Sequence, residues 1–364
     1  MSRQKTLLFY INSIRRGGAE RVLLELAGRF AREGYRAVFV TSFSAPDEYP
    51  VPAGVERLTM EEAGQSARSA LRRNFDRIRK LRALCREYRP AALISFMAEP
   101  NFRAVLAARG LPVRTVISVR NDPEKEYRGR LFGFVGRHIL PEADGCVFQT
   151  ERARAWFPER LQKKSTVIMN QVAQPFFDEP PCAEHRGIVS VGRLNAQKNH
   201  AMLIRAFAAL GPAEDTLTVY GEGPLRVELE SLIRQLGLEG RVLLPGQVSD
   251  IPAAIRGAKV FVLPSDFEGM PNALLEAMAL GLPCIATDCP CGGPAMVVRE
   301  GENGLLIPVG DESALTERLA RLLGDEALRT RLSENARRTA ESFRPEAVFD
   351  QWRRYVESVI SAEE

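Results

Sequence analysis

The sequence predicts an α/β protein with two Rossmann-like domains, each built on a parallel sheet. Strand-like and helix-like segments alternate along the whole chain, which is the pattern of βαβ units. The length of 364 residues suits two domains that can each bury a core. A stretch rich in proline and acidic residues, 173–186, is the best candidate for a linker between them.

The first domain is expected to span residues 1–172. Its apolar runs predict strands at 5–11, 36–42, 91–96, 114–119, 144–149 and 165–169. The amphipathic segments between them predict helices at 19–33, 68–88, 100–109, 126–140 and 150–157.

The second domain is expected to span residues 187–344. Its predicted strands are 187–191, 215–220, 241–244, 259–263, 283–287 and 304–307. Its predicted helices are 198–210, 224–236, 249–256, 271–280, 311–323 and 325–341. Pro345 breaks the last helical run, and one more amphipathic helix is expected at 346–360.

Composition excludes several classes of protein. A net charge of +4 gives no reason to expect a nucleic-acid partner. No run of about 18 apolar residues occurs, and the apolar run 6–11 is too short for a signal peptide, so a cytoplasmic protein is expected. The six cysteines are interpreted as reduced thiols. Cys284, Cys289 and Cys291 cluster without the histidine spacing of a zinc site, and a redox pair there stays open.

The segment 68–89 combines a basic face with one apolar stripe. Its cations outnumber its two acids, Asp76 and Glu87; they are Arg68, Arg72, Arg73, Arg77, Arg79, Lys80, Arg82, Arg86 and Arg89. The favoured interpretation is a domain helix with a basic solvent face. The alternative is a helix that rests on an anionic membrane surface or binds an acceptor carrying a pyrophosphate.

Glycine turns follow several predicted strands. Gly17-Gly18 follows the first strand, and Gly221 follows the strand 215–220. Such turns let backbone N–H groups approach an anion, although a plain turn is the alternative. The first is neither Gly-x-Gly-x-x-Gly nor a Walker loop, which disfavours dinucleotide and P-loop sites.

Two cations follow the first strand of the second domain. Arg193 offers a planar fork for two phosphate oxygens, and Lys198 adds a point charge where a helix is expected to begin. Their spacing favours a diphosphate clamp over two ordinary surface cations.

Two glutamates eight residues apart flank an expected strand–turn–helix junction. Glu268 lies in the turn after the strand 259–263, and Glu276 lies in the second turn of a helix that begins near Pro271. The helix N-terminus suits a phosphate, and the carboxylates suit sugar hydroxyls. The alternative is a solvated turn residue and a surface helix residue.

The pattern Glu268-x7-Glu276 resembles the motif of the family-4 retaining glycosyltransferases, which have the GT-B fold. Gly17-Gly18, Arg193 with Lys198, and Gly221-Glu222-Gly223 occur in the order found in that family. The resemblance implies two domains that face each other across a cleft, the first on the acceptor side and the second binding the donor nucleotide sugar. It also implies that residues 345–364 return to the first domain. It implies a nucleotide-sugar donor and no cofactor, and the absence of Asp-x-Asp means that no metal is required.

The resemblance also implies roles for individual residues. Glu276 would hold the ribose hydroxyls, Glu268 would bind a donor-sugar hydroxyl, Gly17-Gly18 would face the phosphates, and Val248 would lie near the base. The turn that approaches the phosphate or sugar comprises Gly269, Met270, Pro271, Asn272 and Ala273. Pro271 has no N–H to donate.

One position departs from the family pattern. Arg120 stands where many members have a histidine, in the loop after the fifth strand. An arginine cannot act as a base, but it can bind a phosphate or a sugar oxygen.

The expected activity is retaining transfer from a UDP-sugar to a glycan or lipid-linked acceptor in bacterial polysaccharide synthesis. Arg193, Lys198, Glu268 and Arg120 are the expected catalytic residues. The enzyme is expected in the cytoplasm, either free or peripheral on the inner face of the membrane, held by 68–89. Alternatives are a sugar-nucleotide 2-epimerase of similar fold and a non-catalytic nucleotide-sugar sensor.

Overall fold

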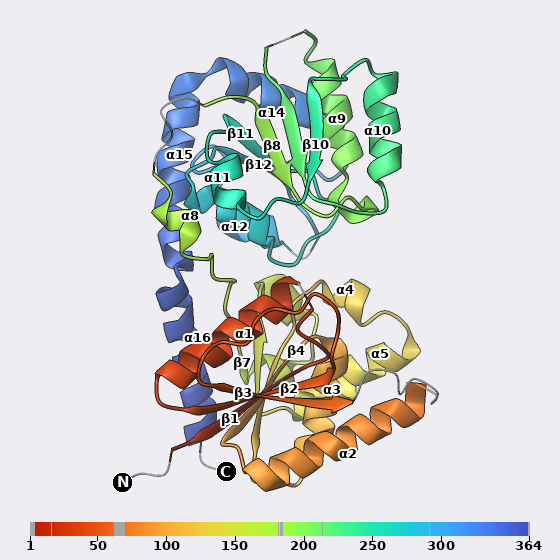
Figure 1. Ribbon diagram of the computed structural model, residues 1–364, viewed down its shortest axis with the longest axis vertical. Helices are drawn as coiled ribbons and strands as arrows, with labels where there is room; N and C mark the ends of the chain where they lie inside the picture. Colours follow the sequence, from red (N-terminus) through yellow and green to blue (C-terminus); the bar gives the residue numbers. More distant parts are fainter. Residues whose placement is uncertain are drawn as a thin grey trace. The chain divides into compact units, whose positions relative to one another are not determined.

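The computed structural model divides into two compact units (Figure 1). Unit 1 comprises Met1–Asn170 and Val348–Glu364, and unit 2 comprises Gln171–Ala347. The structure describes residues 4–15, 17–61, 70–180, 182, 185–212, 214–290 and 292–362. Parts of the predicted basic helix (68–69), of the expected linker (181, 183–184) and of the expected first domain (1–3, 363–364) therefore lie outside the described residues, as does Cys291.

Unit 1 is built on a seven-stranded parallel sheet in the order β3-β2-β1-β4-β5-β6-β7. Its strands are β1 (Thr6–Ile11), β2 (Arg36–Phe43), β3 (Val55–Glu61), β4 (Ala92–Phe96), β5 (Arg114–Ser118), β6 (Gly145–Phe148) and β7 (Ser165–Val167). Strand β3 was not predicted. It is an edge strand that is only partly buried, so its sequence lacks a continuous apolar run.

Helices cover both faces of this sheet. They are α1 (Gly18–Arg32), α2 (Ala70–Tyr88), α3 (Ala98–Ala108), α4 (Pro123–Glu126), α5 (Arg130–Phe134), α6 (Glu151–Ala155), α7 (Glu159–Gln162) and the C-terminal α16 (Pro345–Ser361). Alternate residues of β1 point to opposite faces: Phe9 packs with α1 and α16, and Tyr10 with α2 and α3. The predicted return of the C-terminal helix to the first unit is thereby confirmed.

The single helix predicted over 126–140 is wrong. The chain forms α4, then α5, then a π-helical turn (Val135–Ile139) and a 3-10 turn (Leu140–Glu142). Gly129 interrupts the helix with φ of 90°, a conformation that costs glycine little. Gly136 lies where a Cβ would come within 3.0 Å of the Trp156 ring, so close packing also selects its residue type.

Unit 2 has a six-stranded parallel sheet in the order β10-β9-β8-β11-β12-β13. Its strands are β8 (Ile188–Val191), β9 (Leu217–Tyr220), β10 (Val242–Gly246), β11 (Val260–Leu263), β12 (Cys284–Thr287) and β13 (Leu305–Ile307). The predicted class, α/β with two parallel-sheet Rossmann-like domains, is confirmed.

The helices of unit 2 follow the predicted alternation, with two short helices at 175–178 and 293–297 that were not predicted. They are α8 (Pro175–Asp178), α9 (His200–Ala209), α10 (Arg226–Gln235), α11 (Ile251–Ile255), α12 (Asn272–Ala279), α13 (Gly293–Val297), α14 (Glu312–Gly324) and α15 (Glu326–Ala340), with 3-10 turns at Ala196–Lys198 and Glu341–Phe343. One core joins the sheet to α9, α10, α14 and α15. Within the segment expected as a linker, α8 buries Phe176 and Phe177.

The strand orders locate a switch point in each sheet. Successive strands are added in one direction from β1 to β3 and then in the other from β4, so the switch in unit 1 lies between β1 and β4. In unit 2 it lies between β8 and β11 for the same reason. Open α/β sheets bind ligands at the carboxyl ends of the strands beside this point. Of the helices in the described part of the chain, none is long and apolar enough to cross a membrane.

Candidate active site

The switch point of unit 2 brings together the residues predicted to bind the donor. The loop after β8 carries Arg193 and Lys198, and the loop after β11 carries Glu268. Because β8 and β11 are hydrogen-bonded neighbours, their two loops leave the sheet side by side.

Lys198 and Glu268 form a direct ion pair. Lys198 Nζ lies 2.5 Å from Glu268 Oε1, and the side chains are 18% and 8% exposed. Ser265 Oγ donates to the same oxygen over 2.7 Å. The interpretation of Glu268 as a solvated turn residue is therefore wrong. Within the described residues both hydrogen bonds to Glu268 reach Oε1, which leaves Oε2 available for a ligand hydroxyl.

Further hydrogen bonds hold the two loops at a defined separation. Gln197 accepts from the Asp266 N–H over 2.8 Å at its carbonyl and donates from Nε2 to the Phe267 carbonyl over 2.9 Å. Asn199 Nδ2 donates to Asp266 Oδ1 over 2.8 Å, and its Oδ1 caps α9 by accepting from the Met202 N–H. The ion pair is thus positioned by backbone as well as by side chains.

The loop after β9 packs against the loop after β8 through glycine. Gly221 has φ of 140°, and a Cβ there would lie 2.0 Å from the Gly192 carbonyl oxygen. The Leu194 N–H donates to the Glu222 carbonyl over 3.0 Å. Gly221 therefore sets the course of the loop that carries Arg193, whose exposed side chain has no ion-pair partner among the described residues.

The turn from Glu268 to α12 has the predicted form. Pro271 stands at the N-cap, and α12 begins at Asn272, so Glu276 lies in its second turn and is partly buried. Gly269, Met270 and Pro271 are buried, and Asn272 and Ala273 are partly exposed. Helix α13 packs against the backbone of this turn. A Cβ on Gly293 would lie only 1.6 Å from the Gly269 carbonyl oxygen.

This packing gives a testable prediction. Gly293→Ala should lower the free energy of unfolding by about 1–3 kcal/mol, because the added methyl group must displace the Glu268 turn or α13. Urea titration measures the effect. Gly324→Ala is the control, since Gly324 also lies in a helix and a Cβ there meets no atom within 4 Å. Equal stabilities of the two variants would contradict the packing.

Two neighbouring titratable groups, His200 and Cys289, are uncharged, so Lys198 and Arg193 are the cations considered for this site. Burial, with a smaller effect of the Lys198 charge, lowers the pKa of His200 to about 3, so this imidazole is neutral at physiological pH. Burial raises the pKa of the Cys289 thiol to about 12. Cys289 instead donates to the Ser265 carbonyl over 3.1 Å and supports the Glu268 loop as a neutral thiol.

The remaining predicted site residues lie elsewhere. Val248 follows β10 in unit 2 and is partly exposed. In unit 1, Gly17 is the N-cap of α1 and Gly18 its first residue. Glu20 folds over this helix end, since a Cβ on Gly17 would lie 2.4 Å from Glu20 Oε2, and burial raises the pKa of Glu20. The amides of Gly17 and Gly18 as phosphate ligands stay a prediction.

Arg120 is integrated into unit 1. Its guanidinium lies 4.6 Å from the centre of the Phe96 ring and donates to Asn170 Oδ1, and its buried Nη1 has no partner among the described atoms. Burial lowers its pKa to about 9, so the group keeps its charge near neutral pH. These contacts give Arg120 a structural role, and its catalytic role stays a prediction.

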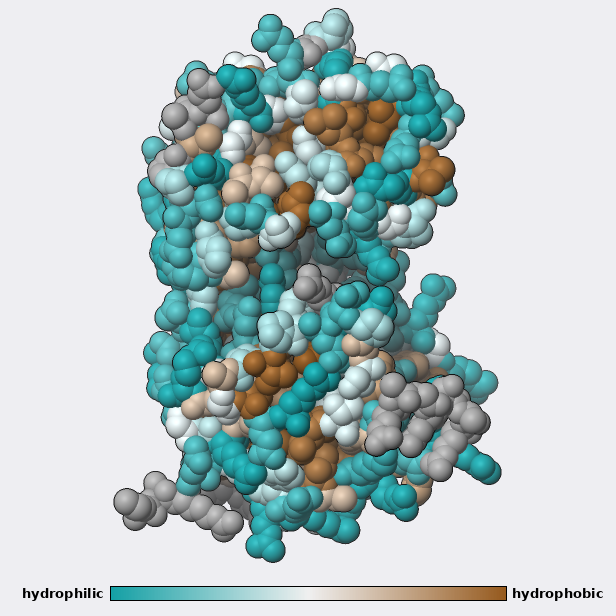
Figure 2. Space-filling model, viewed as in Figure 1, coloured by the Kyte–Doolittle hydropathy of each residue, from teal (hydrophilic) through white to brown (hydrophobic). Residues whose placement is uncertain are grey.

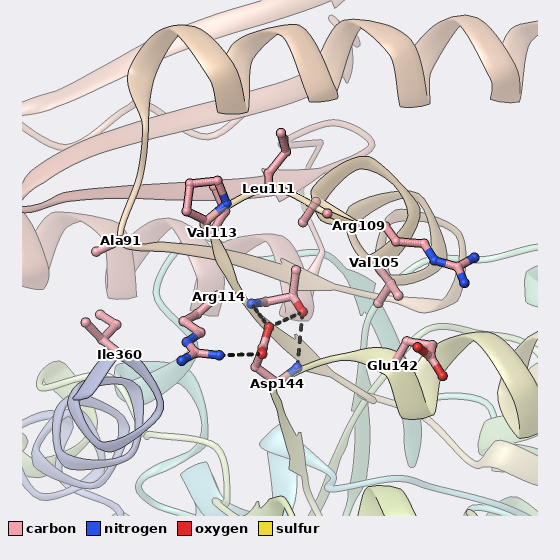
Figure 3. Close-up of a pocket in the computed structure, with 13 residues that line it drawn as sticks. Ala91, Val105, Arg109, Leu111, Val113, Arg114, Glu142, Asp144 and Ile360 are labelled. Carbon is pink, nitrogen blue, oxygen red and sulfur yellow. Dashed lines mark hydrogen bonds and ion pairs between the residues drawn. The ribbon is translucent and has the colours of Figure 1, made fainter. Parts of the chain in front are cut away.

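A cavity of about 490 Å³ lies at the amino-terminal edge of the sheet in unit 1 (Figure 3). The switch point lies at the other edge of this sheet. One charged pair of the lining is internal to it: Asp144 accepts from Arg114 Nη1, the Thr115 N–H and Thr115 Oγ1 at 3.3, 2.7 and 3.0 Å. Since the carboxyl ends of the strands lie at the other edge, we do not assign this cavity to the donor.

Comparison with known families agrees with this geometry. A model described as Glycosyltransferase Family 4 matches residues 16–173, and one described as Glycosyl transferases group 1 matches residues 176–339. The chain belongs to the family-4 glycosyltransferases. Together the two matches span both units, and the GT-B fold predicted for this glycosyltransferase is confirmed.

Two relatives of this glycosyltransferase come from bacteria. It is 26% identical over 363 residues to the GalNAc-alpha-(1->4)-GalNAc-alpha-(1->3)-diNAcBac-PP-undecaprenol alpha-1,4-N-acetyl-D-galactosaminyltransferase of Campylobacter jejuni, covering 97% of this chain and 99% of that protein. It is 34% identical over 248 residues to an exopolysaccharide phosphotransferase of Streptomyces coelicolor, covering 65% of this chain but only 26% of that protein. HepE of Anabaena, solved in complex with UDP, has a similar fold, with a TM-score of 0.83, 21% identity and coverage of 98% and 100%.

Proposed function

We propose that this glycosyltransferase moves a sugar from a UDP-sugar to a glycan or lipid-linked acceptor, retains the anomeric configuration and requires no metal. The observation that carries the proposal is the Lys198–Glu268 pair at the switch point of unit 2. It combines a cation suited to a phosphate with a carboxylate that has one oxygen left for a sugar hydroxyl.

The proposed chemistry follows from where charge develops. As the bond between the anomeric carbon and the diphosphate breaks, negative charge accumulates on the leaving diphosphate. Lys198 and the exposed Arg193 would stabilise that charge more in the transition state than in the ground state, which accelerates the reaction. Glu268 would orient the donor sugar, and Glu276 would hold the ribose of the nucleotide.

Two similarities support a nucleotide-sugar donor and a lipid-linked acceptor. HepE of Anabaena shares the fold and was solved with UDP. The Campylobacter jejuni relative is named for transfer to an undecaprenyl-diphosphate-linked glycan and matches over almost the full length of both chains. Both properties are proposals for the present chain.

The test is a reaction with UDP-, GDP- and ADP-sugars and a panel of acceptors, in the presence of EDTA, with product analysis by NMR. We expect acceptor-dependent UDP release and a product with the anomeric configuration of the donor. An inverted product would refute retention, and a GDP- or ADP-sugar preference would refute the UDP assignment. Epimerised donor without acceptor would indicate the 2-epimerase, and selective binding with no turnover would indicate the sensor.

We also propose that α2 places unit 1 on an anionic membrane. Its exposed cations Arg79 and Arg86 accompany Phe75, which is 68% exposed. Unit 1 also exposes Leu131 and Phe134, although hydrophilic side chains predominate on the face shown in Figure 2. A basic surface with exposed apolar side chains suits a bilayer with negative headgroups.

Co-sedimentation with vesicles tests the membrane proposal. Binding to phosphatidylglycerol vesicles should exceed binding to phosphatidylcholine vesicles, and Arg79→Glu should weaken it. Arg234→Glu, an exposed position on α10 of unit 2, is the charge-matched control. Equal binding to both vesicle types, or an equal loss in both variants, would refute the proposal.

A further inference from the structure

The switch point of unit 1 also carries a polar constellation. Asn12 directly follows β1, and Glu99 lies in the first turn of α3, which follows β4. Strands β1 and β4 are hydrogen-bonded neighbours, so the two side chains converge at one edge of the sheet. Asn12 Nδ2 donates to Glu99 Oε2 over 3.4 Å.

The guanidinium of Arg103 donates hydrogen bonds to both side chains. Its side chain is 1% exposed, and it donates from Nη2 to Glu99 Oε2 and from Nη1 to Asn12 Oδ1, each over 2.6 Å. Its Nε donates to Asn74 Oδ1 of α2 over 2.7 Å. A buried guanidinium bonded in three directions leaves Asn12 and Glu99 little freedom, and its charge is neutralised by Glu99.

Glu99 itself remains accessible. Its side chain is 46% exposed, and both hydrogen bonds that it accepts within the described residues reach Oε2, which leaves Oε1 facing outward without a protein donor. The preceding Met97 has φ of 77° and ψ of 153°, a conformation that is costly for any residue except glycine. The backbone is therefore strained at Met97, two residues before Glu99.

We infer that Asn12 and Glu99 form a binding site for hydroxyl or amide groups of the acceptor glycan, and that Arg103 is its positioning residue. The site offers carboxylate and amide groups, and Arg103, the cation that contacts them, is buried and paired with Glu99. It therefore suits a neutral ligand that donates hydrogen bonds, and it does not suit a phosphate. The assignment of this ligand to the acceptor rests on the proposed function.

Burial raises the pKa of the neighbouring Glu126 carboxyl to about 7, and its Oε1 accepts from the Ala98 N–H over 3.2 Å at the start of α3. Arg77 near the same edge is bonded through Nε and Nη2 to Glu61, at 2.6 and 2.8 Å. Within this described group, Arg103 is therefore paired with Glu99 and Arg77 with Glu61, so neither cation beside Glu99 lacks a carboxylate partner.

The test measures binding of neutral sugars directly, by saturation-transfer NMR with p-nitrophenyl α-glycosides of glucose, galactose, GlcNAc and GalNAc. We expect the wild type to bind at least one glycoside. Glu99→Ala should weaken that binding about tenfold or more, because it removes hydrogen bonds to a charged group. Arg103→Lys, which keeps the charge but loses the fork, should also weaken it.

The control is Glu56→Gln, which perturbs an arginine–carboxylate pair with Arg36 at the amino-terminal ends of β2 and β3, at the other edge of the sheet. It should bind the glycoside within twofold of the wild type. Binding of UDP, measured by calorimetry, should be unchanged in all three variants, which distinguishes loss of this site from unfolding. Absence of glycoside binding in the wild type, or unchanged binding in Glu99→Ala, overturns the inference. Failure of UDP to bind, with glycoside binding intact, would count against the proposed donor and not against this site.

Discussion

Replacing Lys198 by alanine is expected to lower kcat/KM for sugar transfer about 100-fold or more, the range found when one charge-stabilising donor is removed from an active site. Two effects combine. The leaving diphosphate loses a cation, and Glu268, whose side chain is 8% exposed, loses the partner that compensates its buried charge. Initial rates at varied donor concentration measure the change.

Lys259→Ala provides a matched control for this prediction. Lys259 Nζ pairs with Asp215 Oδ1 over 2.8 Å, and the two side chains are 27% and 17% exposed, so a comparable ion pair of unit 2 is broken. Lys259 precedes β11 and Asp215 precedes β9, which places this pair at the amino-terminal edge of the sheet. Transfer should be nearly unaffected in Lys259→Ala. Equal losses in the two variants would show that Lys198 acts through stability alone.

The location of the site loops at one edge of the sheet could be predicted from the sequence. In a parallel sheet every loop that follows a strand leaves from the same edge, so polar residues placed after the strands of unit 2 had to share that edge. Arg193, Lys198, Gly221 and Glu268 follow predicted strands and were singled out by their residue type, their spacing and the family resemblance. The direct contact of Lys198 with Glu268 was not predictable, because it joins residues 70 positions apart and depends on β8 and β11 being neighbours.

Residues that act through tertiary contacts gave no local signal. Ser265 is one of many serines, and only the folded loop directs its hydroxyl to Glu268. Arg103 follows Phe102 on a helix whose sequence suggests an ordinary surface cation, yet its guanidinium is buried beneath the ends of β1 and β4. Gly293 is close to Gly269 only because α13 packs under the turn.

The C-terminal helix α16 buries a large aromatic side chain, Trp352, in unit 1. Trp352→Ala should lower the free energy of unfolding by about 3–5 kcal/mol, the usual cost of removing a large buried aromatic side chain. Trp352 is 2% exposed, and its ring lies 5.5 Å from that of Phe96 on β4. Urea titration followed by circular dichroism measures the change. Phe75→Ala, at an aromatic residue that is 68% exposed, should change it by less than about 0.5 kcal/mol.

The expected loss is large because α16 is part of the core of unit 1 although it is the last helix in the chain. Phe349 packs edge-on against Phe30 of α1, and the Tyr355 hydroxyl accepts from the Cys146 N–H over 2.8 Å on β6. A domain is stabilised by only about 5–15 kcal/mol, so one aromatic contact in this helix accounts for a substantial part of the total. A Trp352→Ala protein as stable as Phe75→Ala would contradict the contribution of the Trp352 contacts to the stability of unit 1.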